Sequence, residues 1–440
     1  MIEGLKPYAE YNESGLPWLD AVPKHWDMAP NRALMRDQRQ VVGSKAPDYT
    51  LLSLTLRGVI ARDMVNPKGK FPAQFNTYKV VKPDDFVFCL FDIDETPRGV
   101  GLSPLKGMIT GAYDVFSPTH RINPRFLYHY YLFVDEGKLM KPLYTGLRKT
   151  IQRGVFASLK APLPPPDEQA AIVRFLDHAN RKIDGFIRAK RKLIGLLNEQ
   201  KQAIIQTAIS KVSTPDCRTM PVRAVLRPIK RMGHPNKTLL SLFRDYGVIP
   251  KDSRENKNVD VRDLALCQLV NPGDVVMNKM KAWQGSIAVS GLEGIVSPDY
   301  MVLEFQIKPI VEDFFHYALR SPSMVANYRK QAYGVRPGQW RLMYPDFCRL
   351  RLPVPSIEEQ QSIVDHIKSE TAALTTAIAR TEREIALMQE YRTRLTADLV
   401  TGKLDVREAA AKLPEPPAAP AAEEVLGDEL LEEPDTEETE

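Results

Sequence analysis

Two segments of the chain carry apolar side chains at the spacing of a long coiled-coil helix. In each segment the apolar positions recur every seven residues, with a second set between them, over more than 40 residues. A 3.5-residue repeat sustained over this length predicts a coiled coil. The repeating positions are Leu176, Ile183, Lys190, Leu197 and Ile204 in the first segment, and Ile367, Leu374, Thr381, Met388 and Leu395 in the second. We therefore predict long helices over residues 167–212 and 357–411.

Both predicted helices begin with nearly the same sequence. Pro162-Leu-Pro-Pro-Pro-Asp-Glu-Gln169 returns 191 residues later as Pro353-Val-Pro-Ser-Ile-Glu-Glu-Gln360. Proline disfavours helix in the residue before it, so each Pro-rich stretch delays the start of the helix. Acidic residues then occupy the first turn, where they complement the helix dipole, and Ser356 is a plausible N-cap.

The segments before the two helices repeat as well. Short apolar runs typical of strands alternate with turns, and their order occurs twice with offsets that drift by a few residues. Val81–Asp85 matches Val270–Asp274, for example, and His129-Tyr130 matches His316-Tyr317. The sequence thus predicts a lead-in (1–29), a mixed α/β (α+β) domain over 30–166, a second copy over 213–356, and a tail over 412–440.

The order of these parts favours antiparallel pairing of the helices. The first helix leaves the first domain and leads to the second, and the second helix returns toward the first. We expect pseudo-two-fold symmetry, with one domain at each end of the pair. A helix of about 42 residues is roughly 60 Å long at 1.5 Å per residue. That length is close to two turns of duplex DNA, at about 34 Å per turn.

Composition is ordinary for a globular protein, but the charge is unevenly distributed. The 440 residues are 43% hydrophobic and 26% charged. Residues 413–440 hold eleven acidic residues and no Lys or Arg, which leaves 60 basic and 44 acidic residues, a net charge of +16, on residues 1–412. A body of this charge attracts polyanions, whereas the acidic tail is expected to be disordered.

Compartment signals are sparse. No run of about 18 apolar residues predicts a membrane span, and the start has no basic-then-apolar pattern of a signal peptide. The four cysteines are scattered and form no CxxC pair, which favours reduced thiols over disulfides or zinc. We expect a cytoplasmic protein that does not associate with membranes.

The sequence contains none of the common catalytic motifs. The chain lacks GxxxxGK[ST], a strand-linked GxGxxG, HExxH and GxSxG, and also the Asn/Asp-Pro-Pro-Tyr/Phe run of adenine methyltransferases. Asp299 and Glu304 are too close together for a nuclease centre and lack its Glu-x-Lys ending. His129 and His316 each stand beside Tyr in a short amphipathic segment, so we interpret them as packed core histidines. We predict no catalytic residue and no metal ligand.

The remaining candidate functional residues are basic and aromatic residues in predicted loops. Arg and Lys neutralise phosphates, and Arg, Gln and Asn can read base edges. The candidate DNA-binding residues are Arg148, Lys149 and Arg153 in the first domain, and Asn278, Lys279, Lys281, Trp283, Gln284, Arg336, Trp340 and Arg341 in the second. An alternative is that the Gly-x-Arg loops are structural turns and the two tryptophans are core anchors.

The repeated Pro-to-Gln helix starts, the lead-in Leu16–Trp26 and the loop Asn278–Gly285 together resemble the DNA-specificity (S) subunit of type I restriction–modification systems. This resemblance covers nearly all of residues 16–405. It implies two target-recognition domains that each read one half of a bipartite, asymmetric DNA site. It also implies helices that set the spacer between the halves and dock partner subunits.

The resemblance further implies two methyltransferase subunits and translocase–nuclease subunits as partners on double-stranded DNA. S-adenosylmethionine, ATP and Mg would belong to those partners, so no cofactor is expected on this chain, which would not itself be an enzyme. The helix residues implied in spacing or docking are Glu168, Gln169, Ile172, Leu176, Ile183, Leu197, Glu359, Gln360, Ile363, Ile367, Leu374 and Met388. A standalone DNA-binding protein and an enzyme with an unrecognised nuclease centre are the open alternatives.

Overall fold

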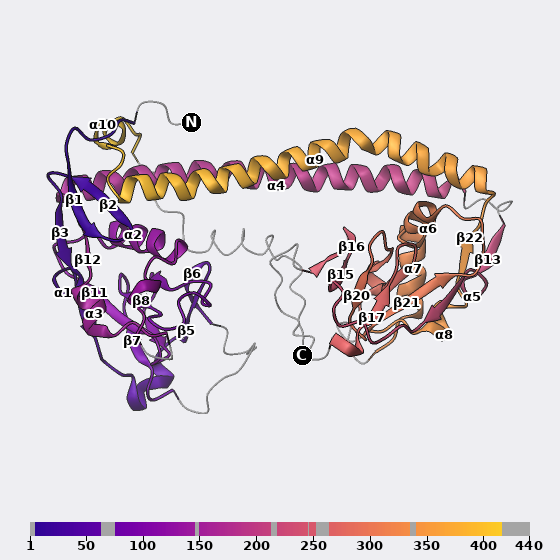
Figure 1. Ribbon diagram of the computed structural model, residues 1–440, viewed down its shortest axis with the longest axis horizontal. Helices are drawn as coiled ribbons and strands as arrows, with labels where there is room; N and C mark the ends of the chain where they lie inside the picture. The colour runs from indigo at the N-terminus through magenta and orange to yellow at the C-terminus, as the bar shows by residue number, and fades with distance from the viewer. Residues whose placement is uncertain are drawn as a thin grey trace. The chain divides into compact units, whose positions relative to one another are not determined.

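The computed structural model describes residues 5–62, 75–145, 149–212, 218–244, 246–251, 264–334 and 340–415. These residues divide into two compact units. The first comprises residues 5–190 and 383–415, and the second comprises residues 191–382. The boundary between the units falls inside both long helices, so each unit contains one domain and one half of each helix (Figure 1).

The first unit is built on a four-stranded antiparallel sheet of order β4-β11-β8-β9. Two-stranded antiparallel pairs β1/β2, β3/β12, β5/β6 and β7/β10 accompany it. The strands are β1 (Tyr11–Leu16), β2 (Leu19–Pro23), β3 (Asp27–Pro30), β4 (Met35–Gln38), β5 (Leu52–Thr55), β6 (Gly58–Ala61), β7 (Lys79–Val81), β8 (Phe86–Phe88), β9 (Val100–Leu102), β10 (Gly107–Ile109), β11 (Asp114–Pro118) and β12 (Lys160–Leu163). The shorter helices are α1 (Asn31–Leu34), η1 (Gly43–Asp48), α2 (Pro124–Glu136), η2 (Lys141–Leu143), α3 (Arg153–Ser158) and α10 (Arg407–Ala411).

The second unit repeats this topology. Its four-stranded sheet has the order β14-β21-β18-β19, and the pairs β13/β22, β15/β16 and β17/β20 correspond to those of the first unit. The strands are β13 (Thr219–Pro221), β14 (Leu226–Ile229), β15 (Leu240–Phe243), β16 (Gly247–Pro250), β17 (Gln268–Val270), β18 (Val275–Asn278), β19 (Ile287–Val289), β20 (Gly294–Val296), β21 (Tyr300–Phe305) and β22 (Arg351–Pro353). The shorter helices are α5 (Val222–Val225), η4 (Leu264–Leu266), η5 (Ala282–Gln284), α6 (Glu312–Leu319), α7 (Pro322–Gln331) and α8 (Tyr344–Phe347).

The duplication extends to single hydrogen bonds. In the turn before β8 and in the turn before β18, a buried aspartate accepts a hydrogen bond from a backbone amide of the same turn. Asp85 accepts from the amide of Lys82 at 2.8 Å, and Asp274 accepts from the amide of Asn271 at 2.7 Å. The residue before each aspartate has a positive φ, 67° at Asp84 and 89° at Gly273. The predicted duplicated mixed α/β fold is confirmed.

The two long helices are α4 (Pro166–Ser210) and α9 (Ile357–Val400). The predicted second helix over 357–411 is too long, because Gly402 follows α9 with a φ of 74° and residues 407–411 form the separate helix α10. In the first unit Lys190 forms an ion pair with Glu384 at 2.6 Å, and Asp184 pairs with Arg392. In the second unit the Lys201 ammonium donates to the Thr375 hydroxyl at 3.1 Å, and Ile209 shares a core cluster with Val364. Residue numbers therefore rise along α4 as they fall along α9, and the predicted antiparallel pairing is confirmed within each unit (Figure 1).

Each domain shares its main core with the helix halves of its unit. In the first unit Phe88, Phe126 and Phe156 pack in one cluster with Leu176 of α4 and Leu399 of α9. The corresponding cluster in the second unit is formed by Phe314, Phe315, Phe347, Ile205, Ile209, Val364 and Ile367. Full burial of such side chains stabilises the fold by roughly 1.5–3 kcal/mol each. Each domain is thereby anchored to its own half of the helix pair.

The helix α7 is the longest of the short helices that were not predicted from the sequence. Its amphipathic pattern is brief, and it follows α6 after only two residues. Its start nevertheless has a recognisable signal, Ser321 followed by Pro322. The Ser321 hydroxyl accepts from the amide of Met324, and proline occupies the first turn, where it does not disrupt the helix.

The two repeated histidines have their pKa values lowered. His129 in α2 is buried, and burial, together with the charge of Arg125, lowers its pKa to about 4. His316 in α6 is partly buried, and burial followed by the charge of Arg320 lowers its pKa to about 4. For His129 the interpretation as a packed core histidine is confirmed. Among the described residues, no helix is long and apolar enough to cross a membrane.

The first unit should lose stability as the pH falls from about 6.5 to about 4. In this window the unfolded chain protonates at His129 while the folded chain does not, because the folded pKa is the lower one. Stability from this residue is therefore complete above pH 6.5 and about 2 kcal/mol smaller at pH 5 than at pH 7. Urea unfolding at both pH values measures the difference. His129→Gln should reduce the pH dependence by that amount and the exposed His120→Gln should not; equal pH dependence in both variants would contradict the assignment.

Candidate functional site

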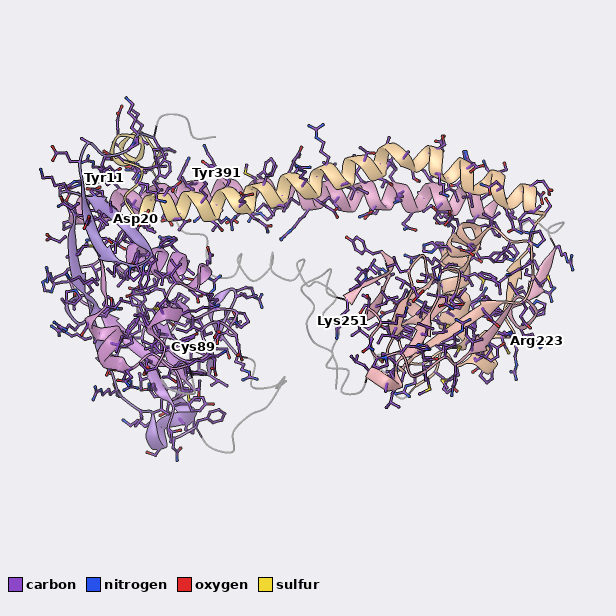
Figure 2. All side chains as sticks on the ribbon, in the orientation of Figure 1. Tyr11, Asp20, Cys89, Arg223, Lys251 and Tyr391 are labelled. Carbon is purple, nitrogen blue, oxygen red and sulfur yellow. The ribbon has the colours of Figure 1, made fainter. Side chains whose placement is uncertain are left out.

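In the first unit the loop after β8 lies against the segment that precedes α3, and in the second unit the loop after β18 lies against the segment that precedes α8. In the first unit the amide of Ile151 donates to the carbonyl of Leu90 at 2.8 Å. In the second unit the amide of Leu342 donates to the carbonyl of Lys279 at 2.9 Å. We call residues 89–98 with Lys149 the first loop cluster, and residues 278–285 with Trp340 and Arg341 the second loop cluster. Cys89, which opens the first loop cluster, is labelled in Figure 2.

The second loop cluster brings most of its predicted residues together. The rings of Trp283 and Trp340 meet edge to face, with centroids 5.4 Å apart. Asn278 is buried, and its Oδ1 accepts from the amide of Met280 at 2.9 Å. The Trp283 Nε1 donates to the Met280 carbonyl at 2.9 Å. The side chains of Asn278 and Trp283 therefore hold the loop in shape, although Trp283 and Trp340 are only partly buried.

Neighbouring elements brace both loops. In the second unit the Nε of Arg329, on α7, donates to the carbonyl of Trp283 at 3.2 Å. Gly285 has a φ of +98°, and a Cβ there would lie 3.3 Å from Val325 of the same helix. In the first unit Tyr144 directly follows η2. Its hydroxyl accepts a hydrogen bond from the amide of Asp94 and donates one to the Asp94 carboxylate, both at 3.0 Å.

The described candidate cations of the first unit are engaged with carboxylates. The Lys149 ammonium lies 3.0 Å from Glu95 and 3.2 Å from Asp94, and these hydrogen bonds raise the pKa of Lys149 to about 12. Partial desolvation alone would raise the pKa of Asp94, but its hydrogen bonds from Tyr144 and Lys149 outweigh it and the pKa is lowered. Arg153, the first residue of α3, pairs with Asp114.

The candidates of the second unit have different surroundings. The Lys279 ammonium donates to the backbone carbonyl of Pro298 at 3.2 Å. Gln284 and Arg341 are exposed, and Lys281 is partly exposed. The segment 278–285 contains two lysines and no acidic residue, whereas 89–98 contains three acidic residues and one arginine. The two loop clusters thus share a backbone arrangement and differ in charge. Arg148 and Arg336 lie outside the described residues.

The two helix-start glutamines make the same contacts in both units. Gln169 accepts from the amide of Asn123, the N-cap of α2, at 2.6 Å and donates to the carbonyl of Pro164 at 2.8 Å. Gln360 accepts from the amide of Val311, the N-cap of α6, at 2.9 Å and donates to the carbonyl of Pro355 at 3.0 Å. Both side chains are buried, so they join helix to domain internally.

The preceding glutamates differ between the copies. Glu168 is 3% exposed and accepts hydrogen bonds from the Tyr8 hydroxyl and from the Trp26 Nε1 at 3.0 Å, while the His25 Nε2 lies 2.8 Å away. Glu359 is exposed and forms a capping box with Ser356. Sequence reasoning missed the Glu168 contact, although the aromatic residues of the lead-in were a usable signal.

The remaining helix candidates fall into two classes of burial. Ile172, Leu176, Ile183 and Ile367 are buried, and Leu197, Ile363, Leu374 and Met388 are partly buried. Two leucines that were not among the candidates are more exposed than any of these. Leu196 is 54% exposed and Leu387 is 56% exposed, and they are 191 residues apart, the repeat distance of the helix starts.

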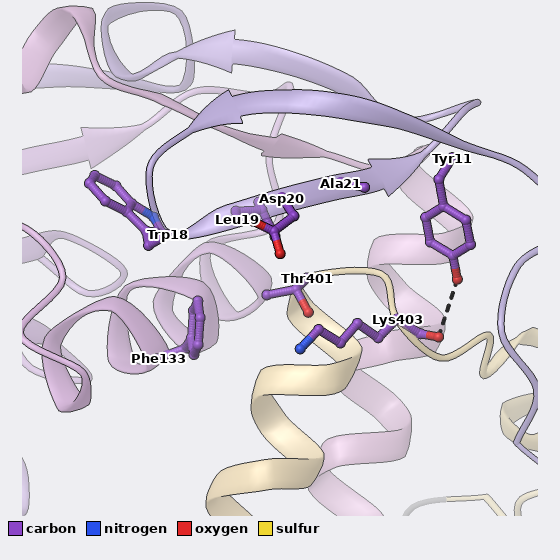
Figure 3. Close-up of a pocket in the computed structure, with 8 residues that line it drawn as sticks. All are labelled: Tyr11, Trp18, Leu19, Asp20, Ala21, Phe133, Thr401 and Lys403. Carbon is purple, nitrogen blue, oxygen red and sulfur yellow. Dashed lines mark hydrogen bonds between the residues drawn. The ribbon is translucent and has the colours of Figure 1, made fainter.

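A hollow of about 230 Å³ lies between the β1–β2 hairpin, the end of α2 and the residues after α9, all in the first unit (Figure 3). The Tyr11 hydroxyl closes one side by donating to the carbonyl of Lys403 at 3.3 Å. Its lining residues are Tyr11, Trp18, Leu19, Asp20, Ala21, Phe133, Thr401 and Lys403. Within the described ranges, His, Cys, Asp and Glu form no group of three or more that could hold a metal ion.

Comparison with known proteins connects these features to a family. Residues 111–193 match the family model described as the type I restriction modification DNA specificity domain. The chain carries a type I DNA-specificity domain. The matched segment runs from β11 through α2 and α3 into α4, so the specificity domain includes Lys149, Arg153 and Gln169. The resemblance inferred from the sequence is confirmed. No curated protein matches the chain.

One solved structure shows that the fold extends beyond this specificity domain. A structure from work on complex assembly and conformational transition of the type I R-M system has a TM-score of 0.52 at 16% identity, over 87% of this chain and 99% of that one. The HsdS subunit from Thermoanaerobacter tengcongensis gives a TM-score of 0.39 at 17% identity, over 89% and 100% of the two chains. The S subunit of a type I restriction-modification system from M. genitalium gives 0.33 at 12%, over 90% and 98%.

Replacing Gln360 by Met should destabilise the second unit by about 2–6 kcal/mol. The apolar side chain has a similar volume but leaves the amide of Val311 and the carbonyl of Pro355 without their partner, at about 1–3 kcal/mol for each buried group. The neighbouring Gln361→Met is the matched control, because Gln361 is exposed. Urea unfolding of both variants provides the measurement. Equal free energies of unfolding in the two variants would show that the Gln360 contacts do not support the domain.

Proposed function

We propose that this chain is the DNA sequence-specificity subunit of a type I restriction–modification complex. Each unit reads one half of a bipartite, asymmetric DNA site through its loop cluster. The observation that carries the proposal is the match of residues 111–193 to the type I specificity domain. The strand order of the unit that contains this segment, and its helix-start contacts, recur in the second unit. Two copies of one backbone arrangement that carry different side chains suit the reading of two different half-sites.

The long helices have two roles in this proposal. They set the length of DNA between the half-sites, and they dock two methyltransferase subunits, to which translocase–nuclease subunits are added for cleavage. Leu196 and Leu387 support two equivalent docking surfaces, because both leucines are exposed and they are separated by the repeat distance. S-adenosylmethionine, ATP and Mg are then bound by the partner subunits, and this chain contributes recognition without catalysis.

Exchanging residues 222–352 for the corresponding domain of another specificity subunit should change one half of the methylated sequence. The other half and the spacer should stay as they were, because the first unit's domain and both helices are retained. Mapping methylated adenines in a host that carries the variant and its methyltransferase subunits measures all three features at once. A change in both halves would refute modular reading. A tight, sequence-selective footprint by the isolated chain would instead favour a standalone DNA-binding protein.

Leu196→Glu or Leu387→Glu should each reduce the number of bound methyltransferase subunits from two to one, and the double variant should bind none. A buried charge at the centre of an apolar contact weakens association by at least about tenfold. Asn198→Glu and Gln389→Glu are matched controls, because both residues are exposed, polar and 191 positions apart. Native mass spectrometry of the assembled complex counts the subunits. Two bound subunits in the double leucine variant would place the docking surface elsewhere.

A further inference from the structure

The two loop clusters occupy equivalent places in their units, but their lysines have different partners. In the first loop cluster Lys149 is held by Asp94 and Glu95, and the loop itself carries three acidic residues. In the second loop cluster Lys279 is held by a backbone carbonyl, and the loop carries no acidic residue. An ammonium that already has two carboxylate partners gains little from a phosphate, because the carboxylates would lose their counter-charge. An ammonium on a carbonyl keeps its full charge available.

Further cations surround the second loop cluster. Arg329 and Lys330 end α7, which braces the loop, and both are exposed. Arg341 is exposed directly after Trp340, and its backbone pairs with Tyr333 at 2.9 and 3.2 Å. The paired tryptophans and Gly285 restrict the loop, so the basic groups are presented by a scaffold that is already ordered. Preorganised cations lose less conformational entropy on contact with a phosphate backbone.

We propose that the second loop cluster provides the phosphate contacts, and hence the salt-dependent part of DNA affinity, while the first loop cluster adds little to it. This inference rests on the proposed function and divides it unequally between the units. Each phosphate contact made by a Lys or Arg releases condensed counterions from the DNA. The slope of the logarithm of the association constant against the logarithm of the salt concentration becomes more negative by about 0.9 per contact. Lysines 149 and 279 should therefore differ in their effect on that slope.

The experiment measures the affinity of the chain, assembled with its methyltransferase subunits, for two DNA duplexes over a series of KCl concentrations. One duplex contains the methylated site and the other does not. Lys279→Gln and Arg341→Gln should each make the slope shallower by about 0.9, and both together by about 1.8. Lys279→Arg should keep the wild-type slope. Lys149→Gln, which removes the lysine of the first loop cluster, should leave the slope within about 0.3 of wild type.

A gain-of-function variant tests the same inference in the opposite direction. Asp94→Asn combined with Glu95→Gln releases Lys149 and removes two negative charges, so the slope should become steeper by about 0.9. The inference is overturned if Lys149→Gln flattens the slope as much as Lys279→Gln, or if the double variant leaves it unchanged. The duplex without the site keeps this result separate from the proposed function. Absence of bipartite methylation by the wild-type complex would refute that function, while the slopes would still decide between the two loop clusters.

Discussion

Gln169 and Gln360 connect, in each unit, the first turn of a long helix to the amino end of a domain helix. Each amide satisfies one backbone donor and one backbone acceptor at a point where two elements meet and neither has an internal partner for those groups. A smaller or apolar side chain would leave both groups buried and unpaired. The contact therefore determines where each domain is held on its helix, and it explains why proline and glutamine recur together in the sequence.

The structural features that could be predicted from the sequence were those marked by a regular spacing of apolar residues or by a repeated segment. Helix pairing follows from apolar residues every seven positions, and duplication follows from matched segments in the same order. Features that depend on residues distant in the sequence were not visible. Glu168 is bound by Tyr8, His25 and Trp26, which lie more than 140 residues earlier. The α7 helix is too short for a strong periodic signal, although its Ser-Pro start could have revealed it.

Polar positions in the helix seam show how equivalent residues of the repeat acquire different roles. Lys190 crosses to Glu384 on the other helix, and its ammonium also lies 5.2 Å from the centroid of the Phe186 ring. Thr381, at the equivalent position, turns its hydroxyl back to the carbonyl of Ala377 at 2.7 Å. A lysine that must meet a carboxylate penalises other registers, whereas a self-satisfied threonine does not. Register between the helices is thus specified more strongly in the first unit.

The same separation of roles applies to the loop clusters. The backbone contacts of the loop clusters are common to both copies, because these contacts fix the position of each loop on its domain. The loop side chains differ in charge, and each unit braces its loop through a different charged residue. Asp94 illustrates the point, since it ties Tyr144 to Lys149 within the first unit, while the second unit braces its loop with Arg329. Because Tyr144 and Arg329 brace the loops from outside them, other loop residues can differ between the units without loss of the backbone arrangement, as the proposed reading of two different half-sites requires.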